Sequence, residues 1–189
     1  AIGREALQNA NTGNTAYNVA IGYQAGKLVS SGLRHVFIGG NAGDAVTTGN
    51  DNVAIGYSAF STEDTGNKNT ALGAYALQDL NYDGDGHNTA VGYNAGAEIT
   101  TGTSNTLIGG LAGDALTDGN ANVAVGRGAL SGETRGDRNV AIGYEALLAQ
   151  NNTSDLDAYN VAVGYAAGTA VSTGVNNTLI GGLAGDALT

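Results

Sequence analysis

The stretch Asn18-Val19-Ala20-Ile21-Gly22-Tyr23-Gln24-Ala25-Gly26 recurs, with small variations, along the whole 189-residue chain. We number each copy from its central glycine, which is Gly22 in this stretch. Successive central glycines are 17 residues apart, except for longer steps that lead to Gly22, Gly92 and Gly164. A short fixed period of this kind is typical of a solenoid in which each repeat forms one coil. The central glycines are Gly3, Gly22, Gly39, Gly56, Gly73, Gly92, Gly109, Gly126, Gly143, Gly164 and Gly181.

The three residues before each central glycine predict a strand. Val19-Ala20-Ile21 is short and β-branched, and it lies between Asn18 and Gly22. A helix is disfavoured because two glycines recur in each 17-residue step, and each costs about 1 kcal/mol relative to alanine in a helix. The prediction is an all-β protein: one parallel β-solenoid, or β-roll, of about eleven 17-residue coils. It covers residues 1–189 as a single segment that we expect to be truncated at both ends.

A larger period lies above the coil. Thr106 to Thr117 repeats letter for letter at Thr178 to Thr189, so four coil types alternate in a super-repeat of about 70 residues. The fourth type is followed by an insertion of variable length and sequence, at 8–17, 78–87 and 148–159. Variable segments at a fixed place in a solenoid are typical of loops on one face, which is often the binding face.

Alternation along the strand leaves two apolar faces. Val19 and Ile21 share one face, and Ala20 lies on the other. We expect the Val/Ile side chains and the alanine three residues after the glycine to fill the interior. The face with small residues is then an interface between parallel chains, since a long apolar strip usually marks one. The opposite assignment, with Val and Ile facing the partner, stays open. The expected interface residues are Phe37, Leu107 and Leu179 as anchors, with Ala20, Ala54 and Ala71.

Bulk composition narrows the function. The chain has 17 acidic and 7 basic residues, a net charge of −10, 32 glycines and no cysteine. This balance argues against nucleic acid, which requires clustered Lys and Arg, and the absence of cysteine excludes a disulfide scaffold. No stretch reaches the roughly 18 apolar residues of a membrane helix, so we expect no membrane insertion in this segment. There are two histidines and no clustered catalytic groups, so we predict that the chain is not an enzyme.

The recurring phrase also resembles a known family. Asn-Val-Ala-Ile-Gly-x-x-Ala, at 18–25, 52–59 and 139–146, resembles the head-domain repeat of trimeric autotransporter adhesins and related repeats of phage tail fibres. The resemblance covers the whole chain. It implies a left-handed parallel β-roll, a homotrimer, and an extracellular, cell-surface or virion location.

Three groups of polar residues invite a functional interpretation. The asparagine four residues before most central glycines predicts a stacked amide ladder. The recurring tyrosines would suit either a glycan-stacking surface or a structural ladder of rings. These tyrosines are Tyr23, Tyr57, Tyr93, Tyr144 and Tyr165 after central glycines, and Tyr82 and Tyr159 in insertions. Asp83 and Asp85 alternate with glycines, as suits calcium, but the pattern does not recur in the other insertions. We therefore expect no cofactor, with calcium as the alternative.

The combined interpretation is a structural or adhesive segment of an extracellular or virion fibre, either a rigid shaft or an adhesin head. One alternative is a module that binds a host-surface glycan or protein through its insertion loops. The other is a self-polymerising extracellular filament. Replacing 78–87 by a short turn separates the first two, because only a receptor-binding module would lose function.

Overall fold

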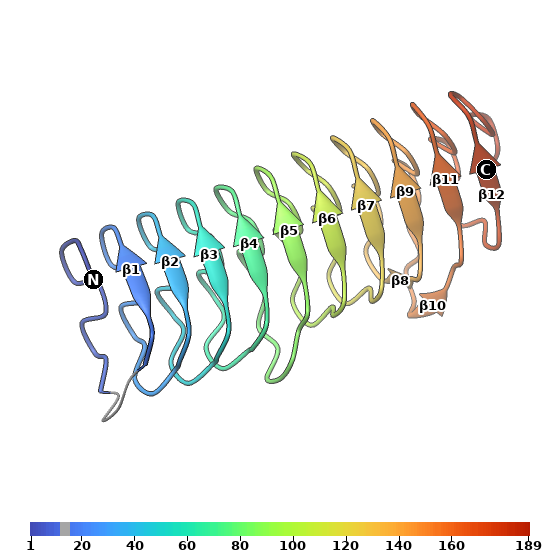
Figure 1. Ribbon diagram of the computed structural model, residues 1–189. Helices are drawn as coiled ribbons and strands as arrows, with labels where there is room; N and C mark the ends of the chain where they lie inside the picture. Colours follow the sequence, from blue (N-terminus) through green and yellow to red (C-terminus); the bar gives the residue numbers. More distant parts are fainter. Residues whose placement is uncertain (12–15) are drawn as a thin grey trace.

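The computed structural model describes residues 1–11 and 16–189 and forms one elongated parallel β-solenoid (Figure 1). Each coil contributes one three-residue strand, and equivalent strands pair in parallel, residue for residue, with the next coil: Val19 pairs with Val36 and Ile21 with Ile38. The ten strands of this sheet lie in the order of the sequence. They are β1 (Val19–Ile21), β2 (Val36–Ile38), β3 (Val53–Ile55), β4 (Thr70–Leu72), β5 (Thr89–Val91), β6 (Thr106–Ile108), β7 (Val123–Val125), β9 (Val140–Ile142), β11 (Val161–Val163) and β12 (Thr178–Ile180).

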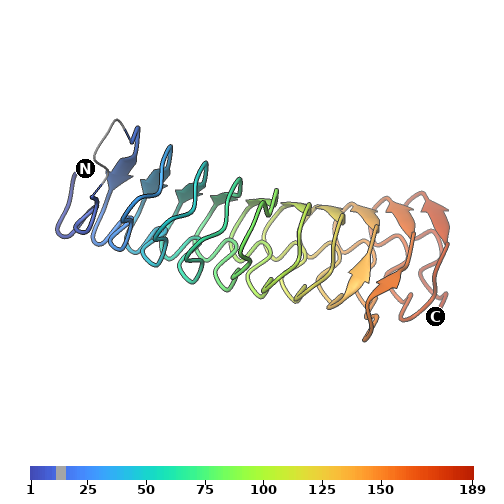
Figure 2. The same cartoon turned by 90° about the horizontal axis from the view of Figure 1, so that it is seen from below.

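The predicted β-solenoid with a 17-residue repeat is confirmed. The first phrase adds a single bridge residue, Ile2 opposite Ile21, so the ten-stranded sheet is one coil shorter than the count of phrases. In the third insertion, β10 (Leu156–Asp157) pairs with β8 (Gly136–Asp137) in a separate two-stranded sheet. Residues 12–15 of the first insertion lie outside the described residues. Seen from below in Figure 2, the coils of the solenoid follow one another along a single axis.

The central glycines form a column in which backbones stack directly on one another. A Cβ added to Gly22 would lie 2.3 Å from the carbonyl oxygen of Gly39, and φ at Gly22 is +137°. Both features exclude a side chain, because such a contact cannot be relieved by rotating a side chain and L-residues avoid this φ. The glycine in the phrase is therefore required by the geometry of stacking.

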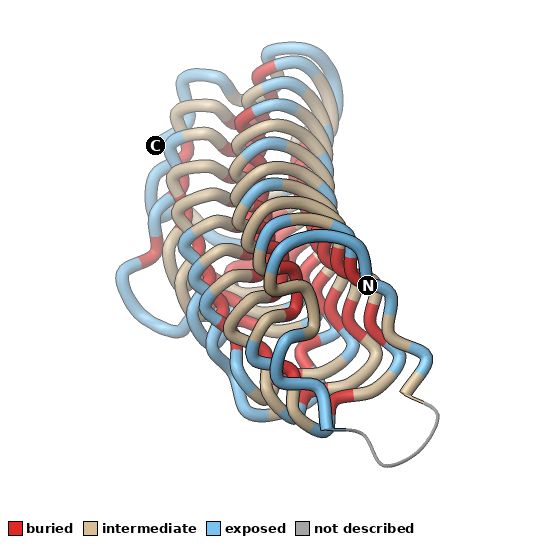
Figure 3. Tube along the Cα trace, turned by 90° about the vertical axis from the view of Figure 1, so that its left-hand side faces the viewer, coloured by how far each residue is buried: buried red, intermediate tan, exposed pale blue. Residues whose placement is uncertain are grey.

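The interior contains the face with small residues, so the predicted chain interface is wrong. Ala20, Ala54, Ala71, Phe37 and Leu107 are completely buried within the single chain and have no surface to offer a partner. Leu179, in the last coil, is partly buried and packs against the same core. Val and Ile of each strand point outward instead, as the buried residues in the middle of each strand show. In Figure 3 the buried residues line the inside of the tube along its length.

The physical reason is that two positions of each coil share a narrow interior. One wall of the interior is the sheet, with the middle residue of each strand, and the other wall carries the residue four after the central glycine. A Cβ added to Gly113, four residues after a central glycine, would lie 2.9 Å from Leu107 Cδ2, and one added to Gly43 would lie 2.7 Å from Phe37. In the coils of Phe60 and Leu130 the strand supplies alanine and the other wall supplies the bulk, and both side chains are fully buried. In the coils of Ala20, Ala90 and Ala162 both positions are small, and the bulky side chains of the neighbouring coils, such as Leu107 and Leu77 beside Gly96, reach into the space. The four-coil super-repeat thus changes which wall carries the bulky side chain, and coils with two small residues are filled from their neighbours, as close packing requires.

The alanine three residues after each central glycine lies at a packed corner, as predicted. Nine of these alanines are completely buried, from Ala25 to Ala167. A larger side chain at this corner would have to displace well-packed neighbours.

Candidate functional site

The outward face of the ten-stranded sheet is a regular, partly apolar feature of the described surface. Two columns of side chains run along this face from coil to coil. The first column consists of the first residue of each strand, and the second consists of the third residue. The first column contains Val or Thr, and the second contains Ile, Leu or Val. Val19 is 45% exposed, Leu72 41% and Ile108 40%. The second column is aliphatic in all ten coils, whereas threonine replaces valine in four coils of the first. An apolar strip of this length usually marks an interface.

Tyrosine and arginine border this strip. We define the trailing column as the residue directly after each central glycine and the leading column as the residue five before it. The trailing column contains Arg4, Tyr23, Tyr57, Tyr93, Arg127, Tyr144 and Tyr165 among smaller residues. The leading column contains Tyr17, Arg34, Asp51, Lys68, His87, Arg138 and Tyr159, and at most of its positions the backbone is left-handed. Tyr93 is 57% exposed and Tyr159 is 49% exposed.

Several of these rings contact one another along the solenoid. Tyr75 lies edge-to-face against both Tyr57 and Tyr93, with ring centroids 5.5 and 6.0 Å apart. Tyr144 and Tyr165 are stacked, with centroids 5.5 Å apart. Tyr57 and Tyr93 were predicted from the sequence, whereas Tyr75, which lies one position further along its coil, was missed. The rings form short ladders that remain accessible, so both interpretations of the tyrosines stay open.

Charged residues of the leading column pair with acids in the next coil. Arg34 donates two hydrogen bonds to Asp51, at 2.5 and 2.8 Å, and this guanidinium lowers the pKa of the Asp51 carboxyl. Lys68 lies 2.5 Å from Asp85. Such exposed pairs stabilise a fold by about 0–1 kcal/mol, so they order the edge of the sheet more than they stabilise it.

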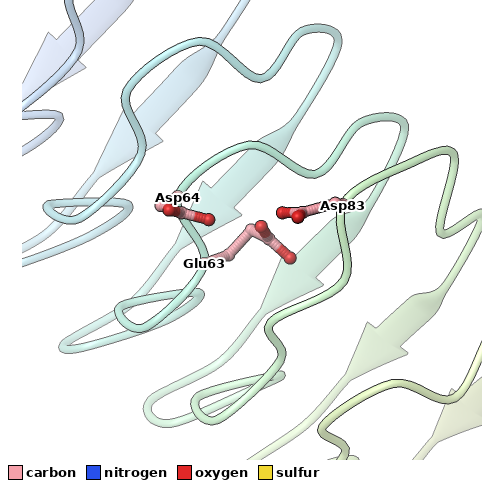
Figure 4. Close-up of side chains that lie close together, drawn as sticks. All are labelled: Glu63, Asp64 and Asp83. Atoms are coloured by element: carbon pink, nitrogen blue, oxygen red, sulfur yellow. The ribbon is translucent and has the colours of Figure 1, made fainter.

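The two expected calcium ligands are not brought together as a pair. Asp85 binds Lys68, whereas Asp83 lies in a group with Glu63 and Asp64, whose carboxylate oxygens come within 4.8 Å of one another (Figure 4). Thr65 Oγ1 donates a hydrogen bond to Asp83. Glu63 is buried, but backbone N–H groups already occupy its oxygens. A cation would have to compete with these donors.

Buried glutamates hold the insertions in place, a role that was not predicted from the sequence. Glu63 accepts hydrogen bonds from the backbone N–H groups of Thr65, Gly66 and Tyr82, the last of which belongs to the second insertion. Burial raises the pKa of Glu63, and these backbone donors oppose that shift. A signal was available, because Glu63 stands seven residues after a central glycine, where most coils have Val, Ile or Leu.

Glu133 has the same role one super-repeat later. It accepts hydrogen bonds from the backbone N–H of Gly136 and Asn152 and from the side chains of Gln150 and Asn152, at 2.8–2.9 Å. Asn152 belongs to the third insertion. Both insertions are therefore anchored at their base by a carboxylate inside the solenoid.

The predicted asparagine ladder runs through the interior. From Asn69 onward, the backbone N–H of each ladder asparagine donates to Oδ1 of the asparagine one coil earlier, for example Asn122 to Asn105 at 2.9 Å. Most side-chain amides also donate to the carbonyl of a glycine fourteen residues later, as Asn105 does to Gly119 at 2.8 Å. The buried amides of this column thereby find partners, as burial demands.

His35 replaces asparagine at one step of the ladder. Its Nδ1 accepts the backbone N–H of Asn52 at 3.3 Å, and its Nε2 lies 2.8 Å from the carbonyl of Gly49, where it must donate. Its backbone N–H donates to Asn18 Oδ1 at 2.9 Å. The ring is fully buried and stacks on Phe37, with centroids 4.7 Å apart. Burial lowers the pKa of His35 to about 4.

The described residues contain no helix that is long and apolar enough to cross a membrane. Comparison of the chain with protein-family models, with curated proteins and with solved structures found no match.

Proposed function

We propose that this chain is a rigid segment of an extracellular or virion fibre whose outer sheet face packs against other copies of the chain. One observation carries the proposal: the single chain buries the small side of each strand and leaves the Val/Ile side in water over ten successive coils. The resemblance of the repeated phrase to adhesin heads and tail fibres supports the fibre role and implies three chains.

The area of the sheet face indicates which of its columns must contact another chain in a stable interface. Ten strands spaced about 4.8 Å apart, each about 10 Å wide, give roughly 430 Å² per chain. A stable interface buries about 800 Å² per partner, so the two aliphatic columns alone are too small. Including the leading and trailing columns widens the face to about 20 Å, or roughly 860 Å². We therefore infer that the tyrosine- and arginine-bearing borders belong to the interface, where both residue types are commonly enriched.

The sheet face is tested by a charge that the single chain can tolerate. Ile108 points outward, so Ile108→Asp leaves the core intact but places a carboxylate in the apolar contact between chains, where an unpaired charge is costly. Thr101→Asp, at an exposed turn, is the matched control. Sedimentation velocity should show dissociation for Ile108→Asp and wild-type mass for Thr101→Asp. An oligomer that survives Ile108→Asp unchanged would refute the sheet face as the interface.

Disulfide trapping tests the borders, because the chain contains no cysteine. In a cyclic assembly about an axis parallel to the solenoid, each coil meets the same coil of its neighbour, so Ser104 and Gly110 of adjacent chains approach one another. Gly110 tolerates a side chain, since an added Cβ would meet only the Tyr93 carbonyl oxygen, at 3.9 Å. Within one extended chain the two positions lie roughly 20 Å apart, too far for a disulfide. Ser104→Cys with Gly110→Cys should therefore cross-link chains on oxidation. Ser104→Cys with Gly40→Cys, four coils out of register, should not.

A second function is favoured by the anchored insertions. Glu63 and Glu133 fix the second and third insertions at their base, and these insertions expose Tyr82, Leu156 and Tyr159. Loops held on a rigid frame suit recognition of a host-surface glycan or protein. If this is the function, replacing 78–87 by a short turn abolishes surface binding while the oligomeric mass stays unchanged.

A further inference from the structure

His35 is the one titratable ring within the ladder, and the hydrogen bonds of the ladder do not require it. At the nine other steps the same position holds asparagine, which does not titrate. At most of these steps asparagine makes equivalent contacts, with an oxygen that accepts from the next coil and an amide that donates to a glycine carbonyl, as Asn105 and Asn122 do. The histidine thus adds a property that the ladder does not need for its hydrogen bonds.

The hydrogen bonds of the His35 ring admit only the neutral tautomer with the proton on Nε2. Nε2 faces the carbonyl of Gly49 and must carry the proton, whereas Nδ1 faces the N–H of Asn52 and must be bare. Protonation would place an N–H on Nδ1 directly against the N–H of Asn52. A buried hydrogen bond then becomes a contact between two donors, and a positive charge is added to a fully buried site.

Neighbouring charges do not relieve this cost. The nearest are Arg34 and Asp51, which neutralise each other in an exposed ion pair. The backbone of Asn52 and Gly49 contacts the ring from the next coil, and Phe37 covers its face within the same coil. In the preceding coil, Asn18 accepts the backbone N–H of His35. None of these groups can become an anion to compensate the imidazolium.

We propose that His35 makes this coil an acid-sensitive point of the solenoid, where protonation separates β2 from the ladder of β3 and opens the segment locally. Phe37, the bulky core residue of that coil, stacks on the same ring, so opening the ladder also exposes part of the core. The device would let a fibre segment that is uniform at neutral pH loosen at one defined coil in an acidic compartment.

The direction of the pH dependence of stability follows from proton linkage. The folded pKa of about 4 lies below the ordinary value of 6.5, so the unfolded state binds more protons between these values. The contribution of His35 to the unfolding free energy is therefore complete above about pH 6.5 and is lost as the pH falls towards 4. The unfolding equilibrium constant should rise up to tenfold per pH unit in this window, or about 300-fold in total.

The experiment compares wild type, His35→Asn and His87→Asn by urea denaturation between pH 7.5 and 4. Carboxylates titrate in all three proteins, so the ratio of unfolding constants isolates each histidine. We expect the acid-dependent loss to disappear in His35→Asn and to persist in His87→Asn, whose side chain is exposed. Equal pH dependence of wild type and His35→Asn would overturn the proposal. NMR titration of the wild type is independent of the variants: a His35 ring that protonates near pH 6.5 in the folded protein would also overturn it.

Discussion

The idea that residues 107 and 113, on the two walls of the solenoid, share one interior space can be tested by a double-mutant cycle in the coil of β6. Leu107→Ala removes a completely buried side chain and should cost about 2–5 kcal/mol of unfolding free energy through lost burial and a cavity. Gly113→Leu alone should cost about 1–3 kcal/mol, because its Cβ would lie 2.9 Å from both Leu107 Cδ2 and Leu116 Cδ1. Together the two changes copy the next coil, where Ala124 faces Leu130.

The backbone permits the exchange. Gly113 has φ +55°, and Leu130 has φ +56° at the equivalent position, so the left-handed conformation already holds a leucine one coil later. Each change then removes part of the defect that the other creates, because Leu116, the other side chain against Gly113, stays in place. We expect a favourable coupling energy of about 2 kcal/mol or more, at the upper part of the range for residues in contact. Recovery should be partial, since Leu107 also fills the space beside Gly96, where an added Cβ would lie 2.7 Å from Leu107 Cδ1.

Urea denaturation of the four proteins of the cycle gives the coupling energy from the transition midpoints, provided that the m-values agree. The control cycle pairs Gly113→Leu with Leu179→Ala, the equivalent core residue four coils away. Sites this far apart should give additive losses. Additive losses in the Leu107–Gly113 cycle as well would refute the idea that the two walls share one interior space.

Three further predictions concern the ladder, the corner and metal. Asn105→Ala leaves the Gly119 carbonyl and the Asn122 N–H without partners and should cost about 2–5 kcal/mol in urea denaturation; a loss below about 1 kcal/mol would show that the ladder is dispensable. Ala95→Leu should overpack a completely buried corner and lower stability by about 1–3 kcal/mol, and an unchanged melting curve would contradict this. Chelator should leave the thermal midpoint unchanged, since backbone N–H groups occupy the Glu63 carboxylate; a loss of stability that calcium restores would instead indicate a metal site.

The sequence predicted the parts of the fold that depend on period. A 17-residue repeat with a strand, a glycine and an alanine in phase specifies stacked coils, and the asparagine column specifies a ladder, because equivalent residues must stack on one another. The assignment of the interior was wrong for a physical reason. Both strand faces are apolar, and the larger side chains of Val19 and Ile21 suggested the core, whereas the interior is filled from two walls and needs only an alanine, such as Ala20, from most strands.

A signal for the correct assignment was present in the sequence. Phe37 and Leu107 occur only where the residue four after the glycine is Gly43 or Gly113, and the coil of Phe60 has Ala54 in its strand. Such reciprocal changes in size indicate two positions that share one space. The buried role of Glu63 was less accessible, because a lone glutamate in an acidic chain is usually solvated and only the contacts of its oxygens identify its partners.

Self-association through the outer sheet face is tested most directly by the mass of the wild-type chain in solution, measured by light scattering at neutral pH over a range of concentrations. The exposed Val/Ile columns predict a stable oligomer, and the resemblance to trimeric fibres predicts three times the chain mass of 18.7 kDa. A chain that stays at 18.7 kDa at every concentration, with its sheet face in water, would contradict the proposal.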